Sequence, residues 1–186
     1  MLGLNFRHLL TDRDLITDLV NTASDYKGLQ ETLKALDVEL LEAKVQYNEE
    51  QIQNPNANVT LYASKRERDS YYRLYAKYTL ESREYNPGSA DVVTMYFYTS
   101  KADYYLYNCE SKYTSLRSGQ YATSGTLAFN FYDDIASMNY SYAVAYVTPK
   151  SDMRGQWLDY GAEWTHTFTG PETQTWSIKC TNTVKL

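Results

Sequence analysis

The stretch DSYYRLYAKYTL, residues 69–80, decides how the first half of this chain folds, because its pattern fits two structures. In a helix, residues three and four apart share one face. That face would carry Tyr71, Leu74, Tyr75 and Tyr78. In a strand, every second side chain points to the same side of a sheet, and this stretch also alternates in that way.

The residues around this stretch favour the helix. Positions 61–84 are rich in Leu, Ala, Lys, Arg and Glu, which are strong helix formers. Ser64 and Glu67 have the spacing of a capping box at a helix start. We therefore predict a helix over residues 61–84 that packs on the segment 29–47. The alternative is a strand, which the β preference of tyrosine supports.

Upstream, the segment 12–52 has the apolar spacing of a helix in a bundle or a coiled coil. Thr11 can cap its start, and apolar residues follow at steps that alternate between four and three. Gly28 interrupts this register and marks either a kink or a break into two helices. The predicted seam for helix packing or oligomerisation consists of Leu15, Leu19, Leu29, Leu33, Leu36, Leu40 and Tyr47.

The motif YNPGS, residues 85–89, ends the second predicted helix, and the composition changes after it. Charge becomes sparse, and Tyr, Thr, Ser and Val alternate in the manner of strands. The predicted strands are 91–100, 104–109, 126–133, 139–148, 156–169 and 173–184. The expected fold class is α+β, with an N-terminal helical hairpin or coiled-coil-like module over residues 1–86 and an antiparallel β-sandwich or small barrel over 90–186.

Composition and charge limit the partners and the compartment. The 186 residues are 43% hydrophobic and carry a formal net charge of −5. Because Lys and Arg form no cationic block, no nucleic-acid partner is expected. The chain shows no signal peptide and no run of the roughly 18 apolar residues that a membrane span needs. In the cytoplasm that this predicts, Cys109 and Cys180 would be buried thiols; a disulfide between them is the alternative.

A search for chemistry finds no catalytic, cofactor-binding or metal-binding signature. Histidine occurs only as His8 and His166, and the two cysteines lack zinc-site spacing. The glycine-rich phosphate motifs and the serine nucleophile motif are missing from the sequence. Acidic residues such as Asp133 and Asp134 fall in a predicted turn, where solvated acids are ordinary. We therefore expect a protein that is not an enzyme and that uses no cofactor.

Tyrosine is the most over-represented residue, with 20 copies against 5 phenylalanines and 3 tryptophans. A tyrosine ring buries much apolar area and keeps a polar tip, which suits surfaces that become dry on binding. Any single tyrosine could equally be an ordinary strand residue. The candidate interface aromatics are Tyr71, Tyr75, Tyr78, Tyr104, Tyr105, Tyr107, Trp157 and Tyr160.

The predicted plan, a helical module followed by a β-domain rich in Tyr, Thr and Asn, is similar to small virion proteins of tailed phages. Neck, tail-adaptor, cement and fibre-attachment proteins are of this kind. The resemblance implies a non-enzymatic structural subunit of a large symmetric assembly, located in the virion. Such a subunit would act through homo-oligomerisation and contacts with other subunits. The alternative is a carbohydrate- or receptor-binding β-module that uses surface Tyr and Trp, with a glycan as a possible ligand.

Overall fold

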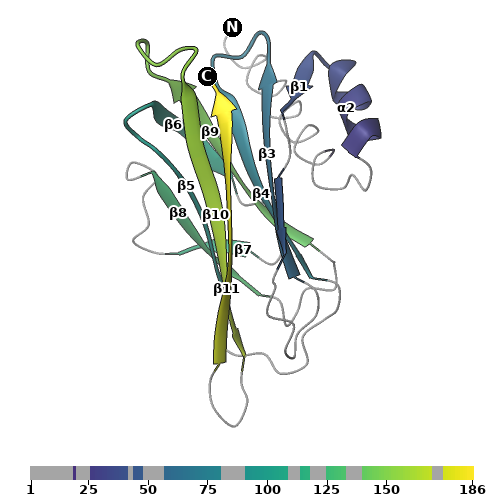
Figure 1. Cartoon of the computed structure of the whole chain (residues 1–186), viewed down its shortest axis with the longest axis vertical. Helices are drawn as coiled ribbons and strands as arrows, with labels where there is room; N and C mark the ends of the chain where they lie inside the picture. Colours follow the sequence, from purple (N-terminus) through teal and green to yellow (C-terminus); the bar gives the residue numbers. More distant parts are fainter. Residues whose placement is uncertain are drawn as a thin grey trace, which may run out of the picture.

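The chain forms two antiparallel sheets that pack face to face, with the helix α2 on the outer side of one of them (Figure 1). The computed structural model describes residues 19, 26–41, 44–47, 57–80, 91–108, 114–117, 125–132, 140–168 and 174–186. Helix α2 spans Tyr26–Lys34.

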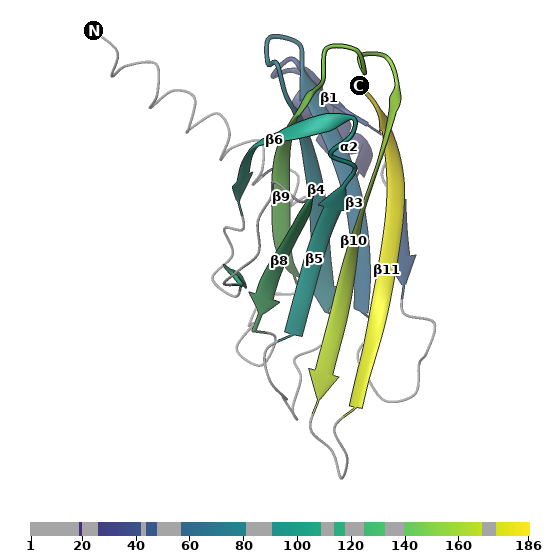
Figure 2. The same ribbon diagram turned by 90° about the vertical axis from the view of Figure 1, so that its left-hand side faces the viewer.

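Each sheet draws strands from distant parts of the chain. Sheet A contains β1 (Val38–Leu40), β2 (Lys44–Tyr47), β3 (Ala57–Arg66), β4 (Tyr72–Leu80), β6 (Ala102–Asn108) and β9 (Tyr140–Pro149). Its order is β1-β3-β4-β9-β6, and β2 also pairs with β3. Sheet B contains β5 (Asp91–Phe97), β7 (Thr114–Leu116), β8 (Thr126–Phe131), β10 (Trp157–Phe168) and β11 (Gln174–Lys185) in the order β11-β10-β5-β8-β7. In Figure 2, β8, β5, β10 and β11 of sheet B lie in front, with β9, β4 and β3 behind them.

The predicted helix over residues 61–84 is wrong, because β3 and β4 form an antiparallel pair there and β4 also pairs with β9. The strand alternation within residues 69–80, and not the helical face, matches the structure. Leu74, Ala76 and Tyr78 point into the core between the sheets. Tyr75 lies on the opposite face, under α2. Burial on both faces and pairing on both edges outweigh the helix propensity of Leu, Ala, Lys and Arg.

The predicted N-terminal helical hairpin is also wrong. Of the predicted helix 12–52, the structure describes a short helix at Tyr26–Lys34, a tight turn and the strands β1 and β2. Asp37 in that turn has a φ of 57°, in the left-handed region. Leu15 lies outside the described residues. The regular apolar spacing resembled that of one long helix because the helix and the strand that follows it direct their apolar side chains into the same cluster.

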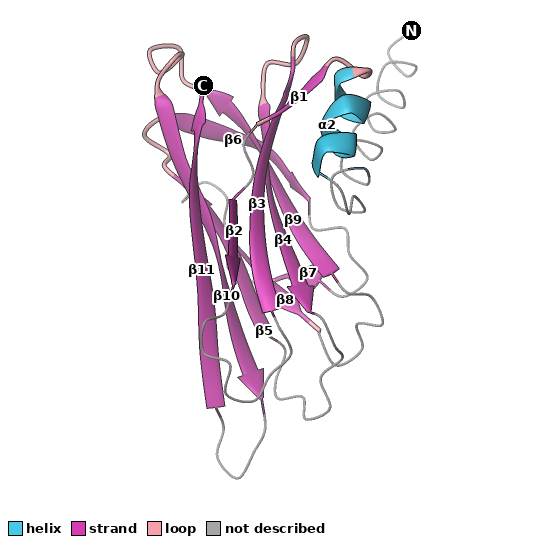
Figure 3. Cartoon of the chain, turned by 45° about the vertical axis from the view of Figure 1, so that its right-hand side comes forward, coloured by secondary structure: helices cyan, strands magenta, loops and turns pink. Residues whose placement is uncertain are grey.

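The hydrophobic core has two parts. The larger lies between the sheets and includes Trp164, Phe129 and Tyr78, all fully buried. The smaller lies between α2 and the outer face of sheet A, which the view in Figure 3 places side by side. There Leu29 and Leu33 of the helix contact the sheet. One face of sheet A is therefore covered by the second sheet and the other by a helix.

Each segment that the sequence predicted as a strand after residue 90 overlaps a strand of the structure, and the short strand β7 was not predicted. The longest hairpin joins β10 and β11 in an unbroken register from Trp157↔Lys185 to Phe168↔Gln174. No helix in the described part of the chain is long and apolar enough to cross a membrane.

Candidate functional site

The outer face of sheet B is the surface on which a binding site can be built. Along β5, buried and half-buried residues alternate, so that Val93, Met95 and Phe97 enter the core and their neighbours face outward. Outward residues of β10 and β11 are likewise more exposed than the inward ones. Helix α2 covers the outer face of sheet A, whereas no described element covers this face of sheet B.

Two large aromatic residues are strongly exposed at one end of this face. Trp157, which opens β10, has 57% of its surface exposed, and Tyr98, which follows β5, has 58%. Because Tyr160 pairs with Phe97, the preceding position on β10, Asp159, lies across from Tyr98. Trp157 and Tyr98 therefore flank a carboxylate on the same face.

Lys101 links two segments at this end of the sheet. Its Nζ donates a hydrogen bond to the backbone oxygen of Trp157 at 2.6 Å and lies 3.8 Å from Oδ2 of Asp159. Lys101 belongs to the turn between β5 and β6, so one side chain links that turn to the start of β10. The link holds the backbone beneath Trp157 in place and balances the charge of Asp159.

A third ring, that of Tyr96, lies flat on the neighbouring part of the face. Tyr96 is the partner of Gly161 in the β5–β10 register, and its ring occupies the space that a side chain at Gly161 would need. Nζ of Lys179 lies 5.7 Å from the centre of the same ring. Burial, and then the charge of Glu163, raise the pKa of Tyr96. We call Tyr96, Tyr98 and Trp157, with Asp159 between the last two, the aromatic face.

Gly161 is required for this arrangement, and we expect Gly161→Ala to lower the free energy of unfolding by about 1–3 kcal/mol. A Cβ there would meet the end of the Tyr96 ring and would lie 2.8 Å from the backbone oxygen of Cys180, which cannot move freely. Urea unfolding followed by circular dichroism measures the loss. Thr181→Ala, at the exposed position that pairs with Gly161, is the control and should stay within about 0.5 kcal/mol. Equal values for the two variants would contradict the packing described.

The predicted interface aromatics do not lie together on one surface of the structure. Trp157 is exposed on the aromatic face, whereas the others whose side chains are described are buried in the two cores: Tyr71, Tyr75, Tyr78 and Tyr160. Burial strongly raises the pKa of Tyr78, whose hydroxyl donates to the backbone oxygen of Thr94 at 3.0 Å. Tyr104, Tyr105 and Tyr107 belong to the edge strand β6, but their side chains lie outside the described ones.

The predicted helical seam is only partly in a helix. Leu29 and Leu33 are buried on α2, Leu40 is buried on β1, and Leu19 and Leu36 are half-buried against the same cluster. Tyr47 lies in β2, and its side chain is not among the described ones.

Sequence reasoning missed Tyr96 and Tyr98. Both occur in the predicted strand 91–100, and their alternation with Met95 and Phe97 was a usable signal for an outward direction. Their position on the same face as Trp157 had no such signal, because it depends on the pairing of β5 with β10, which lies more than 60 residues further along the chain.

A buried polar cluster lies inside the sandwich. Oδ2 of Asp91 accepts a hydrogen bond from Nε1 of Trp164 at 2.6 Å and lies 2.7 Å from Nδ1 of His166. Its other oxygen accepts from the backbone N–H of Thr167 at 2.9 Å. Asp91 is 0% exposed and His166 is 2% exposed. A histidine oriented by an aspartate occurs in catalytic triads, but both side chains of this pair are buried.

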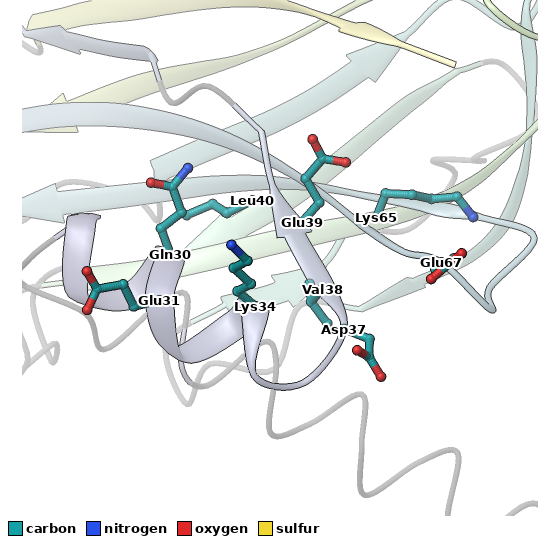
Figure 4. A pocket seen from close by; sticks show the side chains of 9 residues that line it. All are labelled: Gln30, Glu31, Lys34, Asp37, Val38, Glu39, Leu40, Lys65 and Glu67. Atoms are coloured by element: carbon teal, nitrogen blue, oxygen red, sulfur yellow. The ribbon is translucent and has the colours of Figure 1, made fainter.

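A pocket of about 900 Å³ lies between α2, β1 and the turn after β3 (Figure 4). Its apolar part is Val38 and Leu40, and its polar lining is Gln30, Glu31, Lys34, Asp37, Glu39, Lys65 and Glu67. Figure 4 shows that the carboxylates point in different directions and do not converge on one position. In the part of the chain that the structure describes, no three His, Cys, Asp or Glu residues come together as metal ligands.

The fold is that of an antiparallel β-sandwich, with a short helix over one sheet. No family model matches the chain, and no curated protein is significantly similar to it. Among solved structures, the sixth cohesin of scaffoldin B from Acetivibrio cellulolyticus, solved in complex with a dockerin, is 18% identical at a TM-score of 0.34; the match covers 52% of this chain and 74% of that chain. The collagen-binding subdomain of the Enterococcus faecalis surface protein ACE is 9% identical at a TM-score of 0.41, and the match covers 63% of this chain and 89% of that chain. One of these proteins is bound to a dockerin and the other is named for binding collagen. The fold of this chain rests on its own strand pairing.

Proposed function

We propose that this protein is not an enzyme. It is a structural subunit that binds other protein surfaces through the aromatic face. One observation carries the proposal. Trp157 and Tyr98, the two most exposed large hydrophobic residues in the described part of the chain, lie on the same face and flank Asp159.

The physical properties of this surface suit a protein contact. Tryptophan and tyrosine bury large rigid rings at a low cost in conformational entropy, and they are enriched among the residues that dominate binding energies. The link from Lys101 to the backbone of Trp157 reduces the ordering that binding would otherwise require. The side chain of Asp159 is 52% exposed and can accept hydrogen bonds from a partner.

The non-enzymatic part of the proposal is supported by the arrangement of the polar side chains. The pair Asp91 and His166 is buried, and the carboxylates of the pocket beside α2 are exposed and point in different directions. An active site needs a nucleophile or an acid–base pair within reach of a cavity, and neither of these places combines the two.

We expect the double change Trp157→Ala with Tyr98→Ala to weaken the partner contact by about tenfold or more, because truncating such anchors costs more than about 1 kcal/mol each. Sedimentation velocity over a concentration series measures contacts between copies, and co-purification from the native host measures contacts with other proteins. Trp157→Phe is the control and should retain most of the binding. Wild-type protein that sediments as a monomer and co-purifies with nothing would overturn the proposal.

A glycan is the second candidate ligand for the same face. Exposed rings beside a carboxylate and the exposed hydroxyls of Thr181 and Thr183 can stack on and hydrogen-bond to a sugar. Quenching of tryptophan fluorescence by added oligosaccharides, lost in Trp157→Phe, would favour this ligand over a protein.

The tailed-phage particle and the virion location stay predictions from the sequence. Mass spectrometry of purified particles checks both, since a virion subunit would be present in fixed proportion to the other structural proteins.

A further inference from the structure

The outer face of sheet A contains a buried arginine. Arg73 of β4 is 1% exposed and lies on the strand face that α2 covers, between Tyr71 and Tyr75 in sequence. Its guanidinium carbon lies 5.0 Å from the ring centre of Tyr71 and 5.9 Å from that of Tyr146, the residue paired with it on β9. The cation is therefore held against two aromatic rings and removed from water.

Within the described part of the chain, Nη2 is the one nitrogen of this guanidinium that is hydrogen-bonded. Nη2 donates to Oδ2 of Asp69 at 2.8 Å and to the hydroxyl of Tyr71 at 3.3 Å. Nε and Nη1 are buried and have no hydrogen-bond partner in the described part of the chain. Guanidinium N–H groups that have lost water without gaining an acceptor raise the free energy of the state that buries them. The closed arrangement over Arg73 thus carries an energetic cost that a fully satisfied core would lack.

A short segment lies over this face, held by an apolar cluster and by pairing at the edge of the sheet. We call Tyr26–Leu40, which comprises α2, the following turn and β1, the strap. Its buried apolar anchors are Leu29, Leu33, Val38 and Leu40. Strand β1 is three residues long and lies at the edge of sheet A. The turn holds Asp37 at a φ of 57°, which costs free energy for a residue with a side chain.

We infer that the strap opens as a unit while the sandwich stays folded, and that the unsatisfied guanidinium of Arg73 favours this opening by regaining water. Opening uncovers Tyr71, Tyr75 and Tyr146, whose rings lie with the cation on this face. The device is separate from the aromatic face, which lies on the other sheet, so it goes beyond the proposed function and does not depend on it.

Native-state amide hydrogen exchange of the whole chain tests this inference. In the wild type, we expect strap amides such as those of Ala35 and Leu36, which are hydrogen-bonded within the strap, to exchange at least tenfold faster than those of the β10–β11 hairpin. Exchange of strap and hairpin at the same rate would show that the strap opens only on global unfolding, and would overturn the inference.

The double variant Arg73→Met with Asp69→Asn tests the role of the cation. It removes both charges and keeps their approximate volumes, and replacing a buried ion pair by uncharged groups is often stabilising. We expect strap exchange about tenfold slower, with the β10–β11 hairpin as internal reference. Arg68→Met, at an exposed position of the same hairpin turn, is the matched control and should leave strap exchange unchanged. Unchanged or faster strap exchange in the double variant would overturn the role of Arg73, and if that variant fails to fold, the wild-type comparison still decides whether the strap opens.

Discussion

Asp91→Ala is expected to lower the free energy of unfolding by about 3–5 kcal/mol, the largest loss for any single change considered. The carboxyl group is 0% exposed and is the meeting point for Trp164, His166 and the backbone of Thr167. Each buried hydrogen bond contributes about 1 kcal/mol, and each buried donor left without its acceptor costs about 1–3 kcal/mol. Because these groups come from β5 and β10, the loss loosens the pairing at the centre of sheet B.

Equilibrium unfolding in urea measures this effect. Asp103→Ala is the matched control, since the side chain of Asp103 is 71% exposed and lies 3.8 Å from Nζ of Lys150, an arrangement worth less than about 1 kcal/mol. A loss below about 1 kcal/mol for Asp91→Ala would mean that the buried cluster is not a structural centre of the sandwich.

Leu33→Ala is the second large effect, with an expected loss of about 2–5 kcal/mol, as for other fully buried leucines. Leu33 is 0% exposed and anchors α2 on Tyr75, Tyr146 and their neighbours on the outer face of sheet A. Leu36, which continues the apolar register of the sequence, is only half-buried in the turn after the helix. Leu36→Ala should therefore cost clearly less.

The comparison of these two leucines separates the observed packing from the predicted one. A continuous helical seam would make both changes similarly costly, because both residues would lie on the buried stripe. Thermal unfolding of the two variants side by side measures the difference. Equal losses would contradict the change from helix to strand between Lys34 and Val38.

Part of the fold was readable from the sequence, and the part that was not has a physical cause. Strands β5, β10 and β11 of sheet B alternate between inward and outward residues, because one of their faces is wet. Strand β9 is buried on both faces along residues 143–147, and its β-branched and aromatic residues still indicated a strand. Strand β4 has no wet face along Tyr71–Tyr75, since α2 covers its outer side. Apolar residues on both faces produce a pattern that a helix fits equally well, and composition then favoured the wrong structure.

The candidate site was readable only in part for a different reason. Trp157 was identifiable as a candidate from its residue type, but Tyr96 and Tyr98 come to lie on the same face through the register between β5 and β10. Strand register over a long sequence separation is set by the packing of the whole sandwich, and a single sequence does not display it. Asp91 was missed for the same reason, because its partners on β10 lie 73 to 76 residues away.

Hydroxyl-radical footprinting of the complex that the protein forms, with copies of itself or with a partner, tests the central claim most directly. We expect the oxidation rates of Trp157 and Tyr98 to fall together by about fivefold or more on complex formation, since binding centred on these rings removes them from water. Tyr26, which is 38% exposed on α2 at the other sheet, should keep its rate. Unchanged oxidation of Trp157 and Tyr98 in a stable complex would contradict the claim that the aromatic face is the binding surface.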